Sequence, residues 1–120
     1  MRALPVVAIF ACLTLTGQAL AAIPITGKYG DKEGCKYART GEPSTADVFF
    51  LLTKDEIATA ASACTFGDIV SKAPDKIVAK VSCDAEGETG DDVATITPVG
   101  KSAYRITMTD GTDWGPLKKC

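Results

Sequence analysis

Short runs of hydrophobic residues, separated by glycine and proline, follow one another along most of the chain. The clearest run is residues 46–53 (ADVFFLLT), whose aromatic and branched side chains suit a half-buried strand. Residues 102–109 alternate, with Tyr104, Ile106 and Met108 on one face. Turn residues between such runs are typical of antiparallel hairpins. The pattern therefore predicts an all-β fold, a small antiparallel meander that forms a barrel or a sandwich.

Two parts of this meander are less distinct. A first strand is expected over residues 23–29, with residues 35–39 as the next element. Residues 57–66 are ambiguous because they are rich in alanine, which favours helices. We favour strands, since a helix through this region would carry residues 48–52 around all its faces and need burial on every side. The alternative is an α+β fold with one short helix around residues 55–63.

The N-terminal segment has the pattern of a secretory signal. Arg2 precedes an apolar run at residues 4–15, and a small-x-small sequence follows at residues 19–21. The run is shorter than the roughly 20 apolar residues of a membrane anchor. We expect residues 1–21 to be a signal peptide and residues 22–120 to be a single disulfide-stapled β domain, periplasmic or secreted, without membrane insertion.

The cysteines support export. The chain has five, and Cys12 lies in the expected signal peptide, so an even set of four is left. Four cysteines in an exported chain are typical of two disulfides. A zinc site is the competing interpretation, but the chain contains neither a C-x-x-C motif nor a histidine. We therefore expect no metal and no cofactor.

One hairpin predicts how the cysteines pair. Folding the chain about residues 73–74 brings side chains from two strands together on one face. The expected pairs are Val70 with Ile77, Phe66 with Val81, and Cys64 with Cys83. This register predicts a cross-strand disulfide between Cys64 and Cys83, which leaves Cys35 to pair with Cys120. Four cysteines also admit two other pairings.

Charge and composition exclude several function classes. The chain has 13 basic and 15 acidic residues and no histidine. A serine or cysteine nucleophile would lack its usual base, and the negative balance argues against nucleic acid as a partner. The acidic residues between 84 and 92 do not follow the EF-hand pattern and are interpreted as a solvated hairpin. We therefore expect that the protein is not an enzyme. The alternative is a small hydrolase that uses carboxylates such as those of Glu86 and Glu88.

The lone tryptophan marks the candidate binding surface. Trp114 follows Asp110 and Asp113, and these three residues are the candidate surface for binding a partner. The competing interpretation, which we favour for Trp114 because a lone tryptophan in a small domain more often packs inward, is that it completes the core. The expected function is that of an exported, non-catalytic binding module whose partner is another envelope or extracellular protein. A periplasmic inhibitor of a lysozyme or a protease is an alternative within this class.

Three short motifs resemble known exported proteins. Residues 27–29 (GKY) resemble the Gly-x-aromatic opening of calycin-type barrels. The chain from residue 22 resembles small exported bacterial proteins of unknown function with a four-cysteine β-meander. The matching positions are Leu52, Thr53, Ile57, Cys64, Phe66, Asp110, Gly111, Thr112, Trp114 and Cys120. Residues 102–105 (SAYR) are distantly similar to a loop of periplasmic lysozyme inhibitors, without its glycine. The resemblance implies a β fold and a cysteine framework; it does not indicate an activity.

Overall fold

The computed structural model describes residues 22–42 and 45–120, so the predicted signal peptide at residues 1–21 lies outside the described residues. One helix and eight strands follow one another in this part of the chain. They are β1 (Tyr29–Gly30), α1 (Lys32–Thr40), β2 (Phe50–Leu52), β3 (Glu56–Thr59), β4 (Ser62–Ala73), β5 (Lys76–Ala85), β6 (Glu88–Val99), β7 (Ala103–Met108) and β8 (Asp113–Lys119).

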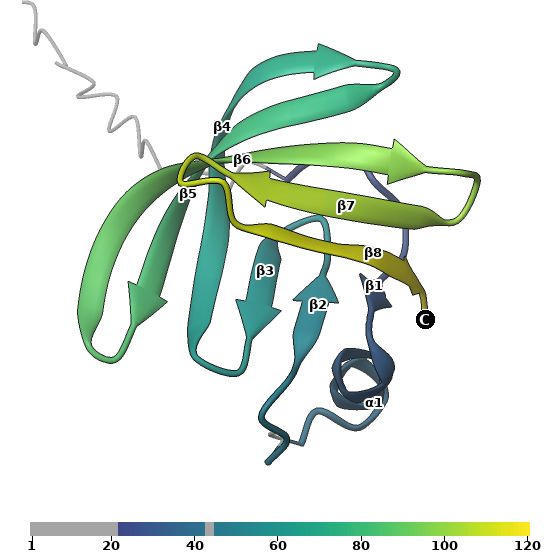
Figure 1. Ribbon diagram of the computed structural model, residues 1–120, viewed down its shortest axis with the longest axis vertical. Coiled ribbons are helices and arrows are strands. Elements are labelled where there is room, and N and C mark those ends of the chain that lie inside the picture. Colours follow the sequence, from purple (N-terminus) through teal and green to yellow (C-terminus); the bar gives the residue numbers. More distant parts are fainter. Residues whose placement is uncertain (1–21, 43–44) are drawn as a thin grey trace, which may run out of the picture.

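The strands form a closed antiparallel barrel (Figure 1). Each strand pairs with the next one along the chain, and β1 pairs with β8 to close the ring. In this closing pair of strands, Tyr29 lies opposite Lys119 and Gly30 lies opposite Lys118. The prediction of an all-β antiparallel meander is confirmed, and of its two forms the structure shows the barrel.

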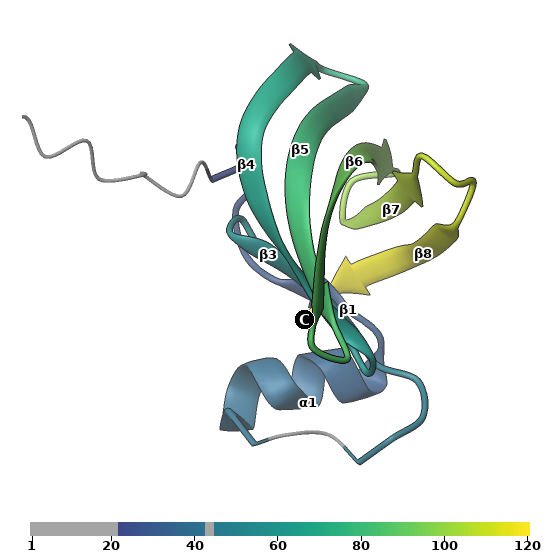
Figure 2. The same ribbon diagram turned by 90° about the vertical axis from the view of Figure 1, so that its left-hand side faces the viewer.

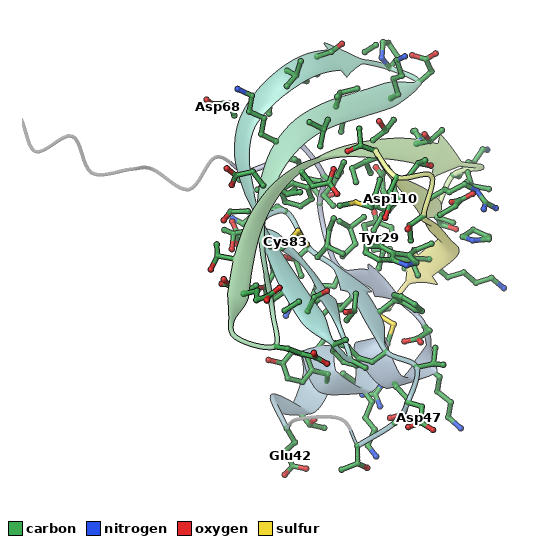
Figure 3. The ribbon with its side chains drawn as sticks, turned by 60° about the vertical axis from the view of Figure 1, so that its left-hand side comes forward. Tyr29, Glu42, Asp47, Asp68, Cys83 and Asp110 are labelled. Atoms are coloured by element: carbon green, nitrogen blue, oxygen red, sulfur yellow. A yellow bond between two sulfur atoms is a disulfide. The ribbon has the colours of Figure 1, made fainter. Side chains whose placement is uncertain are left out.

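Side chains from alternate strand positions fill the barrel. The largest fully buried side chains on the strands are those of Leu52, Ile57, Phe66, Ile96 and Ile106. Burying a side chain of this size stabilises the fold by about 1.5–3 kcal/mol. Tyr29 also points inward (Figure 3), where its ring meets that of Tyr104 edge to face at 4.7 Å. The barrel interior is therefore a packed core.

The prediction of a strand over residues 23–29 is wrong except at its last residue, Tyr29. Ile23 and Ile25 join the core, but the amide of Ile25 donates to the carbonyl of Ile23 at 2.9 Å, which turns the chain tightly. Gly27 then adopts a φ of 86°, a value that favours glycine. These two turns keep the segment out of the ladder, and β1 begins only at Tyr29.

The helix lies where the sequence predicted the next part of the meander, at residues 35–39. Asp31 is the N-cap of α1, and its carboxylate accepts the amide of Gly34 at 2.7 Å. Gly41 ends the helix in a left-handed conformation, with its amide donating to the carbonyl of Tyr37. Figure 2 shows α1 lying below the barrel. Within the described residues, no helix is long and apolar enough to span a membrane.

The alternative of a helix around residues 55–63 is wrong, because this segment forms β3 and the start of β4. Ile57 is fully buried in the barrel, whereas its neighbour Ala58 lies on the outer wall. Such alternation over two residues is the period of a strand. The alanines are outward positions of a hairpin, and they do not signal a helix here.

Both predicted disulfides are present. Cys64 and Cys83 face each other across β4 and β5 and are bonded, and Cys35 of α1 is bonded to Cys120. The second bond spans 85 residues and ties the helix to the end of the chain.

The register of the β4–β5 hairpin is confirmed near the disulfide and wrong near the tip. Phe66 faces Val81 as predicted, but Ile77 faces Lys72, and Val70 is 57% exposed. Two register shifts between Phe66 and Ser71 insert extra residues into β4. Bulges of this kind bend a strand, and the hairpin curls away from the barrel at its tip (Figure 1).

Candidate functional site

The β7–β8 hairpin, which carries the predicted binding surface, uses both of its carboxylates internally. Asp110 accepts the backbone amide of Thr112 at 2.9 Å. Hydrogen bonding by the Thr112 hydroxyl, together with this amide, holds the pKa of Asp110 below its ordinary value. Asp113 forms an ion pair with Arg105 of β7 at 3.1 Å. Both carboxylates are thus engaged in holding the hairpin.

Trp114 lies on the other face of β8 from Asp113, because neighbouring strand residues point to opposite sides. It pairs with Ile106, a fully buried residue, and its ring centre lies 5.7 Å from that of Phe50. The side chain is half-buried and packs against the core. The structure thus places Trp114 and Asp113 on opposite faces of β8, and a role of Asp110, Asp113 and Trp114 in binding stays a prediction.

The acidic residues between 84 and 92 belong to an exposed hairpin between β5 and β6. Glu86 lies in the turn with a φ of 51°, and Glu88 begins β6. Nearby, the hydroxyl of Thr89 donates to the carboxylate of Asp84 at 2.6 Å. Among residues 22–42 and 45–120, no group of three or more carboxylate or cysteine side chains is placed to hold a metal ion.

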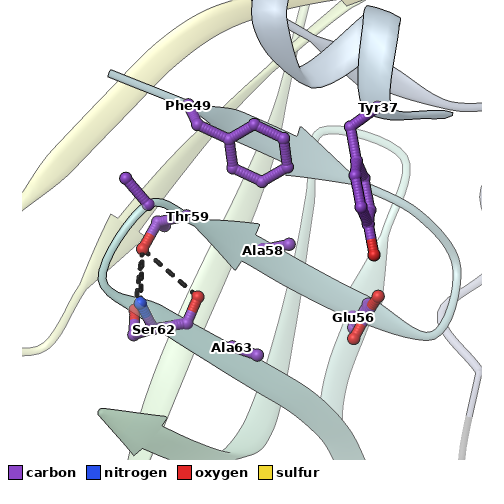
Figure 4. Close-up of a pocket in the computed structure, with 8 residues that line it drawn as sticks. Tyr37, Phe49, Glu56, Ala58, Thr59, Ser62 and Ala63 are labelled. Atoms are coloured by element: carbon purple, nitrogen blue, oxygen red, sulfur yellow. Dashed lines mark hydrogen bonds between the residues drawn. The ribbon is translucent and has the colours of Figure 1, made fainter. Parts of the chain in front are cut away.

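An open groove of about 290 Å³ lies on the outside of the barrel, between α1 and the β3–β4 hairpin (Figure 4). We call it the outer groove. The residues that line it are Tyr37, Phe49, Glu56, Ala58, Thr59, Ala60, Ser62 and Ala63. They come from three separate parts of the chain, which explains why no single motif in the sequence predicts the groove.

A close approach of two backbones brings α1 to the groove. A Cβ atom at Gly34 would overlap the backbone carbonyl of Phe50, so only glycine fits at this point of the helix. The carboxylate of Asp31 also accepts the amide of Phe50 at 3.2 Å, which ties the start of the helix to β2. The helix is thereby held against the strand, with Tyr37 directed toward the β3–β4 hairpin.

Two aromatic rings form one wall of the groove. Tyr37 and Phe49 meet edge to face, with ring centres 5.2 Å apart. Phe49 is only 6% exposed, yet it does not belong to the barrel core. Its side chain points outward because Phe50, the next residue, points into the barrel. This small aromatic cluster fixes the position of the Tyr37 ring.

Two alanines form the floor. Ala58 of β3 and Ala63 of β4 are directly paired, and both point outward because their neighbours Ile57 and Cys64 are buried in the barrel. A methyl group at each position leaves the strand backbone open to close approach. The alanine-rich sequence that made this region ambiguous is thus the signal for a shallow apolar floor.

The turn between β3 and β4 closes one end of the groove. The Thr59 side-chain oxygen accepts the amide of Ser62 at 3.0 Å and lies 2.9 Å from its hydroxyl. These bonds, drawn in Figure 4, hold the turn and occupy both hydroxyl groups. This end of the groove is a rigid polar rim.

A carboxylate lies at the other end. Glu56 points toward the Tyr37 hydroxyl in Figure 4, and the side chain is half-buried. In the described part of the chain, the one ion pair joins Arg105 to Asp113, and it does not involve Glu56. The groove thus combines an aromatic wall, an apolar floor and one acidic group.

This arrangement suits binding. Aromatic side chains beside a small apolar floor give contact area, and a single carboxylate at the edge gives direction to a polar group of a ligand. No family model, no curated protein and no solved structure matches this chain.

Proposed function

We propose that this protein is an exported, non-catalytic binding module that recognises a segment of another extracytoplasmic protein through the outer groove. Export is supported by the signal-like sequence at residues 1–21 and by the two disulfides, which are typical of oxidising compartments. The packed barrel interior directs recognition to the outside of the molecule.

The observation that carries the proposal is the aromatic wall standing over an alanine floor. Partly exposed aromatic side chains in a pocket are the typical anchors of protein–protein interfaces. Here Tyr37 is held in place by Phe49 and by the capped helix, so little side-chain entropy is lost when a partner binds. A preorganised aromatic ring beside a shallow alanine floor is suited to a side chain of a polypeptide segment.

The proposal is tested by partner capture. The purified, oxidised protein is immobilised and exposed to an envelope and culture-medium extract of its source organism, and bound proteins are quantified by mass spectrometry. Ala63→Gln places a larger, uncharged side chain on the groove floor. We expect this variant to retain less than about a tenth of the partner captured by the wild type.

A matched substitution on another wall is the control. Thr107 of β7 is half-buried and points outward, since its neighbours Ile106 and Met108 are buried in the barrel. Thr107→Gln adds a comparable side chain away from the groove, and we expect it to capture as much partner as the wild type. Equal capture by Ala63→Gln and Thr107→Gln would show that the groove is not the recognition site.

A further inference from the structure

We propose that the outer groove receives an arginine side chain of the partner, with the guanidinium group against Glu56. This inference rests on the proposed function and adds the chemistry of the recognised residue. It follows from Glu56, the one charged residue among the described residues that line the groove, together with the aromatic wall and the apolar floor.

The charge of the groove selects a cation. Of the described residues that line the groove, Glu56 alone has a carboxylate, and none is a lysine or an arginine. The chain supplies no ion-pair partner to Glu56 within the described residues. An acidic ligand would be repelled, whereas a guanidinium would gain a charge-assisted hydrogen bond that is stronger than a neutral one.

The aromatic wall favours arginine over lysine. In Figure 4 the Tyr37 ring is seen edge-on, with its hydroxyl toward Glu56; the ring face turned toward Ala58 is the one that the edge of Phe49 meets, which leaves the hydroxyl end of this face beside Glu56 for a ligand. A planar guanidinium can stack on an aromatic face while it hydrogen-bonds a carboxylate in the same plane. A lysine ammonium lacks this flat geometry. Tyr37 and Glu56 together therefore match the shape of arginine.

The floor suits the rest of the side chain. Ala58 lies two residues after Glu56 on the same face of β3, and Ala63 lies beside it on β4. The aliphatic stem of an arginine can lie along these methyl groups while its charged end reaches Glu56. At the far end, the Thr59 and Ser62 hydroxyls already bond each other, so the charged group toward which the floor leads is the Glu56 carboxylate.

The probe that tests this is Nα-acetyl-L-arginine amide, compared with the corresponding citrulline amide. Citrulline has nearly the same shape without the charge. Binding is followed by ¹H–¹⁵N correlation spectra of the folded, oxidised protein. We expect the arginine amide to give saturable shifts at the amides of Glu56, Ala58 and Ala63, and to bind about tenfold more tightly than the citrulline amide.

Glu56→Gln is the variant that tests the role of the carboxylate. Its control is Glu88→Gln, at the exposed first residue of β6. Glu56→Gln should remove the preference for arginine, while Glu88→Gln should keep it. Equal binding of the two amides to the wild type, or shifts confined to other walls, would overturn the inference. If the arginine inference fails but Ala63→Gln still abolishes partner capture, the groove remains the recognition site with a different ligand chemistry. If Ala63→Gln leaves capture unchanged, the proposed function itself fails.

Discussion

Asp31 and Phe50 are joined by two hydrogen bonds that lock α1 to the barrel. The amide of Asp31 donates to the carbonyl of Phe50, and the amide of Phe50 donates to the carboxylate of Asp31, each at 3.2 Å. The same carboxylate oxygen caps the helix at Gly34. One side chain thus starts the helix and sets its position beside β2, which in turn places Tyr37 at the groove.

Removing this carboxylate is expected to loosen the helix. Asp31→Ala leaves the amides of Gly34 and Phe50 without an acceptor, and we expect the free energy of unfolding to fall by about 1–3 kcal/mol. Asp31→Asn keeps an acceptor oxygen and should lose less than half as much. Urea unfolding curves of the two variants provide the measurement. Equal losses would contradict the capping role.

The close contact between Gly34 and Phe50 makes a second prediction. Gly34→Ala would drive a methyl group into the Phe50 carbonyl, so we expect a loss of about 1–3 kcal/mol, as for other overpacked sites. Gly90→Ala is the control, because a Cβ atom there meets nothing within 4 Å. It should change the free energy of unfolding by no more than about 0.5 kcal/mol. A Gly34→Ala variant as stable as the control would mean that the helix does not rest on β2.

The two disulfides should contribute unequally to stability. In the chain-entropy model, the bond between Cys35 and Cys120, which spans 85 residues, is worth about 4–5 kcal/mol, and the bond between Cys64 and Cys83, which spans 19 residues, about 3 kcal/mol. We expect the paired alanine substitutions to lower stability in that order. Denaturant unfolding of the two double variants tests this, and the reverse order would contradict an effect set by loop length.

Tyr104 should make the barrel sensitive to alkali. Burial, and then the charge of ionised Tyr29, raise the pKa of Tyr104 above its ordinary value of about 10. Because the neutral phenol is favoured in the fold, its stabilising contribution is complete below pH 10 and is lost as the pH rises through the folded-state pKa. We expect Tyr104→Phe to remove part of the decline in unfolding free energy above pH 10. An unchanged decline in this variant would contradict the assignment.

The sequence was informative where a regular period of two residues coincided with cysteines. Cys64, Phe66, Val81 and Cys83 fall on one face of two strands, and their register was predicted correctly for this reason. The tip of the same hairpin was not predicted, because each bulge inserts a residue and shifts the pairing. The isolated Gly67, between Phe66 and Ile69, is a sequence signal for a bulge, but it does not predict how far the pairing shifts.

The helix was missed for a different reason. Gly34 lowers helix propensity, whereas in the structure it is required by the close approach of the Phe50 carbonyl. The cap at Asp31 and the end at Gly41 were the available signals. These two capping signals alone do not offset the low helix propensity of Gly34. The helix also depends on the disulfide to Cys120 and on packing against β2, which are tertiary contacts.

The groove could not be predicted from the sequence because the residues that line it are distant along the chain. Tyr37 comes from the helix, Phe49 precedes β2, and Glu56 begins β3. The predicted surface of Trp114, Asp110 and Asp113 was chosen from sequence proximity. Adjacent residues on a strand point to opposite faces, so Trp114 and Asp113, although neighbours in the sequence, lie on opposite sides of β8.

Photocrosslinking tests most directly whether a partner occupies the outer groove. A benzoylphenylalanine replaces Ala60, an exposed residue at the groove rim, and in a second variant it replaces Lys101, exposed in the turn between β6 and β7. After irradiation in the extract, we predict a discrete covalent adduct from position 60 and none from position 101. Adducts of equal yield from both positions, or adducts from position 101 alone, would contradict recognition at the groove.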